Sequence, residues 1–313
     1  MEDHTRKIIV GTRQSSLALT QTGQVIEALQ QLSDAHGLGY TFELRKIVTK
    51  GDQIIDVTLS KVGGKGLFVK EIEQALMDGV IDMAVHSMKD MPYELPDGLI
   101  NGATPARVDA RDCLITKDGG SLADLPAGAV IGTSSLRRSC QLLHARPDLN
   151  VQWIRGNIDS RIRKLHTEGF DAIVLAAAGL QRMGWTDRIS SVLPADVCIP
   201  AVGQGALGIE CRADDHQVRE LLALYNDPTT DLAVSAERSF LGTLNGGCQV
   251  PIGAHATVSQ DGVITLTGMV GSPDGQQLLR HTATGSDAAQ LGLDVAGALR
   301  TEGAERILAE ARS

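Results

Sequence analysis

The sequence predicts an α/β fold built from two similar halves, followed by a small C-terminal α+β domain. Short strands rich in Val, Ile and Leu alternate with helical patterns, which is typical of mostly parallel sheets covered on both faces. An internal repeat places a Gly-Thr pair followed by serine between a strand and a helix, at 11–16 and again at 132–136. After Cys248 the pattern changes, and alternating residues around a turn at 272–275 predict an antiparallel hairpin.

The first half begins with an apolar strand at 7–10 that runs into the small polar turn 11–16. Apolar residues then recur at helical spacing, with Ser15 or Ser16 as the expected N-cap. The free amides and the dipole of a first helical turn favour an anion, and Arg13 would add a guanidinium there. The turn is therefore a candidate anion site, although a capped helix alone is a common structural feature.

Two loops of the first half carry cations. The glycine-rich stretch 61–68 lacks the Gly-Lys-Ser/Thr ending of a nucleotide-binding loop, so we interpret it as a flexible cationic loop. Further on, the strand that ends at Val85 is followed by residues 86–92, which close with a proline. Because proline stops a helix, Lys89 and Asp90 are expected on a loop at the carboxyl end of that strand.

The second half repeats this construction. The stretch 79–85 has an echo at 169–175, and a further strand at 151–154 leads to a helix capped by Asn157. In both halves the cations follow strand ends or lie in first helical turns, the positions that would line a cleft between two α/β halves. These cations are Arg13, Lys61, Lys65, Lys89, Arg137, Arg138, Arg155 and Arg161.

Composition narrows the choice of partners. The chain has 313 residues, a net charge of −9 and 3% aromatic residues, which argues against nucleic acid. Its longest apolar run, 172–180, is too short to span a membrane, and the N-terminus lacks a signal-peptide pattern, so we expect a cytoplasmic protein. Clustered cations in an acidic chain indicate a small polyanionic ligand.

The five cysteines are odd in number and widely spaced, which predicts reduced thiols and neither a disulfide framework nor a metal site. One of them, Cys248, lies between two glycines and Pro251, on a loop with room for a bulky group. This pattern indicates an attachment site, and a free cysteine after a glycine C-cap is the alternative.

Three domains are predicted. Residues 1–105 and 200–224 form the first α/β domain, because the glycine-punctuated stretch 201–210 indicates a crossing back toward the first half. Residues 106–199 form the second α/β domain. Residues 225–313 form the C-terminal α+β domain, which carries the cysteine loop.

Taken together, these segments resemble the porphobilinogen deaminase (hydroxymethylbilane synthase) family nearly from end to end. The resemblance implies two periplasmic-binding-protein-like α/β domains around a cleft. It also implies a transferase that condenses four porphobilinogen molecules head to tail, with release of ammonia, into the linear tetrapyrrole hydroxymethylbilane of heme biosynthesis. The motifs that carry the resemblance are 12–15, 61–68, 86–90, 132–138, 155–157, 203–206 and, most specific of all, the cysteine loop 245–251.

The resemblance further implies a dipyrromethane cofactor joined to Cys248 by a thioether. Asp90 would be the catalytic carboxylate, stabilising positive charge that develops on the pyrrole and managing its proton. A monomer without a metal is expected. Cofactor binding is expected at Ser15, Lys89, Ser135, Arg137, Arg138 and Gly156, substrate binding at Arg13, Gln14, Arg155, Arg161 and Gln204, and a mobile loop at Lys61, Lys65 and Phe68.

Two alternatives share parts of this pattern. A two-domain protein that binds a small anion without catalysis would have the paired halves, but it normally carries a secretory signal and has no use for Cys248 or Asp90. A hydrolase with a cysteine nucleophile would need a histidine beside Cys248, and nothing in the sequence positions His86 or His255 there.

Overall fold

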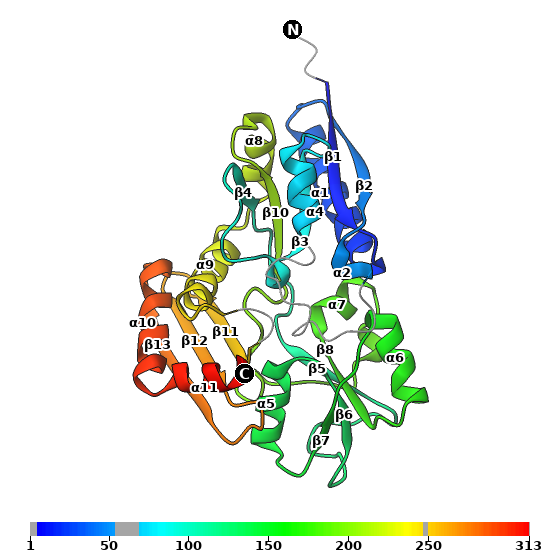
Figure 1. The fold of residues 1–313 in the computed structure, drawn as a ribbon. Helices are drawn as coiled ribbons and strands as arrows, with labels where there is room; N and C mark the ends of the chain where they lie inside the picture. Colours follow the sequence, from blue (N-terminus) through cyan, green and yellow to red (C-terminus); the bar gives the residue numbers. More distant parts are fainter. Residues whose placement is uncertain (1–4, 54–68, 247–249, 313) are drawn as a thin grey trace. The chain divides into compact units, whose positions relative to one another are not determined.

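The computed structural model describes residues 5–53, 69–246 and 250–312 (Figure 1). Contacts divide the chain into unit 1, Met1–Arg107 with Ala206–Asp231, and unit 2, Val108–Gly205 with Leu232–Ser313. The C-terminal segment thus groups with the second half, and its separation as a third domain stays a prediction. Within the described ranges no helix has the length and apolar content to cross a membrane.

Unit 1 is built on a five-stranded sheet in the order β2-β1-β3-β10-β4. Strand β1 runs parallel to β2 and β3, whereas β10 is antiparallel to β3 and β4. The strands are β1 (Arg6–Arg13), β2 (Tyr40–Ile47), β3 (Met83–Ser87), β4 (Leu99–Ala103) and β10 (Leu207–Arg212). The helices are α1 (Ser16–Ala35), α2 (Lys50–Gln53), α4 (Lys70–Met77), α8 (His216–Tyr225) and the 3₁₀ turn η1 (Met88–Asp90).

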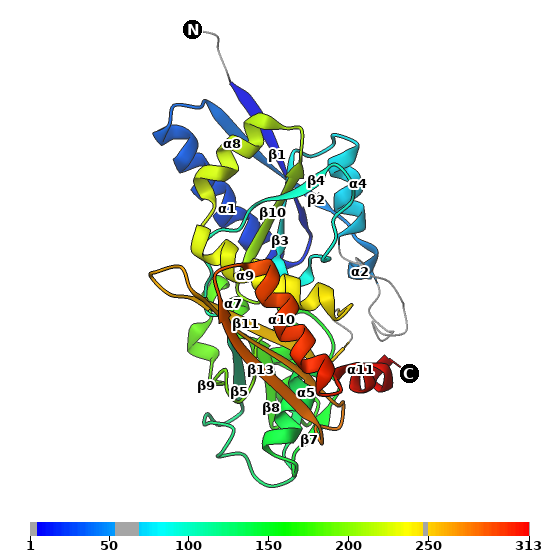
Figure 2. The same ribbon diagram turned by 90° about the vertical axis from the view of Figure 1, so that its left-hand side faces the viewer.

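The two faces of this sheet bury different side chains. Met83 and Val85 of β3 pack in the core that α1 and α8 cover. Ala84, between them, packs on the opposite face with Ile72 and Leu76 of α4. Figure 2 shows α1 and α4 on opposite sides of the sheet. The alternation follows the period of two along a strand, and burial on both faces explains why these strands are apolar along their length.

Unit 2 contains a second five-stranded sheet, in the order β7-β6-β8-β5-β9. This is the order of unit 1 with β6 in the place of β1, β8 in that of β3 and β5 in that of β10, which confirms the prediction of two halves built alike. The strands are β5 (Asp112–Thr116), β6 (Val130–Gly132), β7 (Asn150–Gln152), β8 (Ala172–Ala176) and β9 (Ser191–Val192). The helices are α5 (Leu136–Ala145), α6 (Ile158–Thr167), α7 (Ala177–Arg182) and the 3₁₀ turn η2 (Thr186–Arg188).

The rest of unit 2 is an antiparallel sheet, β11-β12-β13, with helices packed on it. Figure 2 shows α10 lying across β12 and β13. Phe240, Leu266 and Val295 share one buried core, and the predicted hairpin and the two helices after it are confirmed. The elements are α9 (Pro228–Thr243), β11 (Ile252–Val258), β12 (Ile264–Gly271), β13 (Leu278–Gly285), α10 (Ala288–Thr301) and α11 (Ala304–Arg312).

Three expectations need correction. The sheets are mixed rather than mostly parallel, because β10 and β5 are antiparallel to their neighbours. Each is the first strand after the chain passes from one unit to the other, so no crossover helix within its own sheet makes it parallel. The turn expected at 11–16 begins only after Arg13, which pairs with Ile47, and the glycine-punctuated stretch 201–210 becomes a strand only from Leu207.

Candidate functional site

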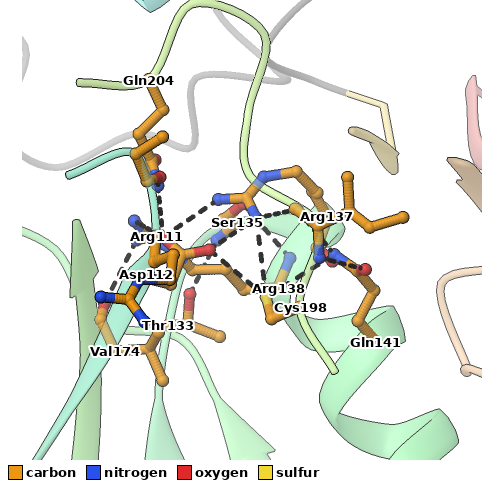
Figure 3. A network of polar contacts seen from close by, with 12 residues as sticks. Arg111, Asp112, Thr133, Ser135, Arg137, Arg138, Gln141, Val174, Cys198 and Gln204 are labelled. Atoms are coloured by element: carbon orange, nitrogen blue, oxygen red, sulfur yellow. Dashed lines mark hydrogen bonds and ion pairs between the residues drawn. The ribbon is translucent and has the colours of Figure 1, made fainter. Parts of the chain in front are cut away.

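Unit 2 contains a buried ion-pair network centred on Asp112, the first residue of β5 (Figure 3). Arg137 Nη1 donates to Asp112 Oδ2 at 2.6 Å, and Arg138 Nη2 donates to Asp112 Oδ1 at 2.8 Å. Both arginines lie in the first turn of α5, where Ser135 is the N-cap. Asp112 has no exposed surface, and the two arginines are 4% and 6% exposed. One carboxylate therefore fixes two guanidiniums.

Neutral groups complete the surroundings of Asp112. Gln204 Nε2 donates to Asp112 Oδ1 at 2.9 Å and to the carbonyl of Ala110 at 2.7 Å, and the Cys198 thiol donates to Asp112 Oδ2 at 3.3 Å. Burial alone would raise the pKa of the Asp112 carboxyl. The charges of Arg137 and Arg138 outweigh burial and hold that pKa well below its usual range, so Asp112 is ionised at neutral pH.

The network keeps an excess of positive charge. Asp112 supplies one negative charge against the guanidiniums of Arg137 and Arg138. Arg155 and Arg161 extend the positive region, since partial burial, followed by the charges of Arg138 and Arg155, lowers the pKa of Arg161 to about 10. Guanidiniums that repel one another are stabilised by a bound anion, and a guanidinium can hold a carboxylate through two parallel hydrogen bonds, as Arg137 does with Asp112. The arrangement suits a ligand with several carboxylates.

A glycine turn positions Arg161. Asn157 caps α6 as predicted, and its Oδ1 accepts from the Ser160 amide at 2.9 Å. The preceding residue, Gly156, has a φ of 121°, and a Cβ there would lie 1.9 Å from Ser160 Oγ. The Gly156 carbonyl accepts from Arg161 Nε at 2.8 Å. Only glycine fits this turn, and its carbonyl orients the guanidinium.

The strand that follows the cysteine loop passes beside Arg137. Strand β11 begins at Ile252, and a Cβ at Gly253 would lie 3.1 Å from Arg137 Cδ and 3.0 Å from the Ile199 carbonyl oxygen. That oxygen also accepts from Arg137 Nη1 at 2.7 Å. The missing side chain at Gly253 therefore lets the chain that leaves the loop approach the cationic network closely.

Unit 1 holds three predicted residues where β1 gives way to α1. Arg13 is the last residue of β1, and Gln14 follows it, exposed. Ser15 is the N-cap of α1, and its Oγ accepts from the amide of Ala18 at 3.3 Å. Because the hydroxyl accepts this bond, it keeps its own hydrogen as a donor.

Lys89 and Asp90 lie on η1, the 3₁₀ turn that directly follows β3. Both are half-buried. The expected loop is thus a short ordered turn at the carboxyl end of the strand. In this structure Ser15, Lys89 and Asp90 belong to unit 1, whereas Ser135, Arg137, Arg138, Gly156, Arg155, Arg161 and Gln204 belong to unit 2.

Four predicted site residues, Cys248, Lys61, Lys65 and Phe68, lie outside the described residues. The other four cysteines are buried. Burial raises the pKa of the Cys113, Cys140 and Cys211 thiols to about 12 and also raises that of Cys198. A thiolate is the reactive form of cysteine, so these four side chains are inert at neutral pH.

Sequence reasoning missed Asp112 and the supporting role of Gln204. The one signal in the sequence that could have indicated Asp112 is an acidic residue at the start of the apolar strand 112–116. Its partners Arg137, Arg138 and Gln204 are 25, 26 and 92 residues away, so no local pattern joins them. In the described part of the chain, no group of three or more His, Cys, Asp or Glu side chains could hold a metal ion.

We predict that Asp112→Asn lowers the free energy of unfolding by about 3–5 kcal/mol, because two buried guanidiniums lose their counter-charge. Urea denaturation at pH 7 measures this loss. Folding depresses the pKa of Asp112, so its stabilisation is present above the unfolded-chain pKa of about 4 and is lost as the pH falls below it. The difference in the free energy of unfolding between Asp112→Asn and wild type should therefore become smaller at acidic pH.

Asp148→Asn is the matched control, since Asp148 pairs with Arg146 at 2.7 Å on the surface. It should change stability little, because exposed ion pairs contribute little. Equal unfolding curves for Asp112→Asn and wild type at pH 7 would show that the buried network does not stabilise unit 2.

Solved structures of low sequence identity resemble parts of the fold. The second substrate binding domain of a putative amino acid ABC transporter from Streptococcus pneumoniae has a TM-score of 0.44 and 14% identity, covering 69% of this chain and 90% of that one. A YaeC-family lipoprotein from Enterococcus faecalis has a TM-score of 0.42 and 14% identity, covering 72% of this chain and 93% of that one.

Family models and sequence relatives are more specific. Residues 8–220 match the porphobilinogen deaminase dipyromethane cofactor binding domain, and residues 232–301 match the porphobilinogen deaminase C-terminal domain. The porphobilinogen deaminase of Paenibacillus macerans is 60% identical, covering 95% of this chain and 98% of its own. That of Brevibacillus brevis is 61% identical, covering 96% of each. These matches over nearly the whole length show that the chain belongs to the porphobilinogen deaminase family.

Proposed function

We propose that this chain is the transferase that condenses four porphobilinogen molecules head to tail into hydroxymethylbilane, with release of ammonia, in heme biosynthesis. Membership of the porphobilinogen deaminase family supports the reaction. The observation that carries it in the structure is the excess positive charge held around Asp112, because each pyrrole of the substrate bears an acetate and a propionate. Its primer is a dipyrromethane cofactor.

The donors of unit 2 fit such a cofactor. Two linked pyrroles carry four carboxylates, and the fixed guanidiniums of Arg137 and Arg138 exceed the charge of Asp112 by one. Ser135 and Gly156 lie at the starts of α5 and α6, where helix N-termini favour anions. We assign these four residues, with Ser15 and Lys89 of unit 1, to cofactor binding. When bound, the cofactor supplies the free pyrrole α-carbon to which substrate is added.

Substrate binding is assigned to Arg13, Gln14, Arg155 and Arg161. Arg161 is the best supported, because burial, followed by the neighbouring charges of Arg138 and Arg155, lowers its pKa, and a bound carboxylate would relieve the repulsion between the charges. The sequence predicts that Gln204 binds substrate. Its amide nitrogen binds Asp112 and Ala110, which supports an indirect role through the orientation of the arginines.

Asp90 is assigned as the catalytic carboxylate. Departure of ammonia leaves positive charge on a pyrrole, and a carboxylate nearby stabilises that charge and accepts the proton released after coupling. The position of Asp90 on the half-buried turn η1 supports this role, since a turn between ordered elements holds the carboxylate in place.

Cys248 is assigned as the covalent attachment point. The four described thiols are buried with raised pKa values, which leaves Cys248 as the cysteine best suited to react. Lys61, Lys65 and Phe68 stay predictions as a mobile loop.

We further propose a cytoplasmic monomer that binds no nucleic acid. Light scattering of the purified protein with and without DNA would check the oligomeric state and the lack of nucleic-acid binding.

Intact-mass measurement tests the attachment. Denatured wild-type protein should exceed its polypeptide mass by two linked pyrroles, whereas Cys248→Ser should show the bare mass. Cys211→Ala, which removes a buried thiol, is the control and should keep the excess. If wild type shows the bare mass even after incubation with porphobilinogen, the alternative of a small-anion-binding protein without catalysis replaces the transferase.

Asp90→Asn should lower kcat by about 10²- to 10⁴-fold, the range for loss of a positioned acid or base, while the cofactor mass is retained. The rate of hydroxymethylbilane formation measures the effect. Asp97→Asn changes an exposed carboxylate of the same unit and should leave kcat near wild type. Near-normal turnover by Asp90→Asn would remove Asp90 from the mechanism.

A further inference from the structure

Unit 1 contains a second cluster of buried ionisable side chains that the proposed mechanism does not use. It consists of Glu73 on α4, His86 on β3 and Glu210 on β10, which are 7%, 5% and 1% exposed. His86 Nε2 lies 2.9 Å from Glu210 Oε2. In the antiparallel register His86 pairs with Gly208 and Glu210 with Ala84, so the two side chains share the face that α4 covers.

The hydrogen bonds of this cluster are incomplete. Among the described residues, Glu73 Oε1 and Glu210 Oε1 are both buried without a hydrogen-bond partner. Even with a protonated imidazole, two ionised carboxylates would leave one uncompensated negative charge away from solvent. Burial of an unpaired charge is costly, and carboxyl groups avoid the cost by retaining a proton.

Glu73 is the group positioned to keep that proton. Burial, followed by the charge of Glu210, raises the pKa of Glu73, whereas His86 and Lys70 act in the opposite direction. Strand β4, which also contacts α4, contributes no ionisable residue, and Ile9 of β1 and Ile47 of β2 pack in the same core. Arg13 of β1 lies two residues beyond the Gly11–Ala84 pair, on the same face of the sheet. Burial and Glu210 nevertheless outweigh the cations.

The cluster supports the turn that carries Lys89 and Asp90. A Cβ on Gly208, the cross-strand partner of His86, would lie 2.2 Å from Met91 Sδ and 3.0 Å from Met88 Cε. These methionines flank the Lys89–Asp90 pair. The turn therefore packs against the backbone of β10 at Gly208, where no side chain intervenes. The Met88 amide also donates to the carbonyl of residue 206 at 3.0 Å.

We propose that Glu73, His86 and Glu210 form a buried positioning network, in which Glu73 is uncharged and the His86–Glu210 bond fixes the end of β3 beneath Asp90. The role given to Asp90 rests on the proposed function, whereas the uncharged state of Glu73 does not. An ionised Glu73 would add a negative charge close to the His86–Glu210 pair. That charge would weaken the support of the turn η1 by the end of β3. These three residues act through β3 and do not touch the reacting atoms.

Infrared difference spectra test the proton directly. Wild type at pH 7 should show the carbonyl stretch of a protonated carboxylic acid that is missing from Glu73→Gln and retained in Asp78→Asn, an exposed control at the end of α4. Absence of the band from wild type, or its persistence in Glu73→Gln, would overturn the proposal.

Thermal unfolding provides a second test of the same proton. A carboxyl whose pKa is raised by folding destabilises the protein increasingly as the pH rises above the unfolded-chain value of about 4.3. Glu73→Gln cannot ionise, so its Tm relative to wild type should rise by about 2–4 °C between pH 5 and pH 8. Asp78→Asn should show no such trend. A constant difference for Glu73→Gln would also overturn the proposal.

Kinetics test the positioning role. Glu210→Gln keeps the shape of the side chain but removes the charge that binds His86, so kcat should fall by about 10- to 100-fold. The KM for porphobilinogen and the cofactor mass should stay near wild type, because no ligand contact is removed. An unchanged kcat, or a loss confined to KM, would overturn the positioning role. If wild type itself lacks turnover, the proposed function fails, while the infrared and thermal tests still decide the state of Glu73.

Discussion

One buried carboxylate determines how the cationic site of unit 2 is built. Without Asp112, Arg137 and Arg138 could not remain almost fully buried, because desolvating an isolated charge is very unfavourable. With Asp112 present, short hydrogen bonds fix both guanidiniums, so the positive charge that Asp112 does not neutralise is held in a fixed position. Donors that are oriented before a ligand arrives lose little conformational entropy on binding. Under the proposed function, Asp112 orients the donors of a carboxylate ligand without touching that ligand.

The repeated topology explains why serine-capped helix N-termini occur in both units. Strands β1 and β6 hold equivalent places in their sheets, and each leads into a helix capped by a serine, Ser15 or Ser135. In an α/β sheet the helix N-termini gather at the carboxyl ends of the parallel strands, where their amides point toward a ligand. The same construction therefore supplies two sets of donors, and the Asn157 cap of α6 adds a third.

The local features could be predicted from the sequence because they depend on a few consecutive residues. The N-caps Ser15 and Asn157, the buried strands and the C-terminal hairpin are of this kind. The two buried networks could not be predicted in this way, because their hydrogen bonds join residues far apart in the sequence. Asp112 and Gln204 are 92 residues apart, and His86 and Glu210 are 124 residues apart. From sequence alone, Arg137 and Arg138 look like exposed clamps. Only the packing of α5 against β5 reveals that both are buried on a carboxylate.

The burial of four thiols has a consequence for oxidative damage. Peroxides attack the thiolate, and the oxidation of cysteine to sulfenic and then sulfinic acid starts from that form. Cys113, Cys140, Cys198 and Cys211 are almost entirely in the thiol form at neutral pH and have no access to solvent. These four thiols therefore need no cellular reductant to stay reduced in the folded protein. Among the five cysteines, Cys248 is the one to which this protection by burial is not assigned.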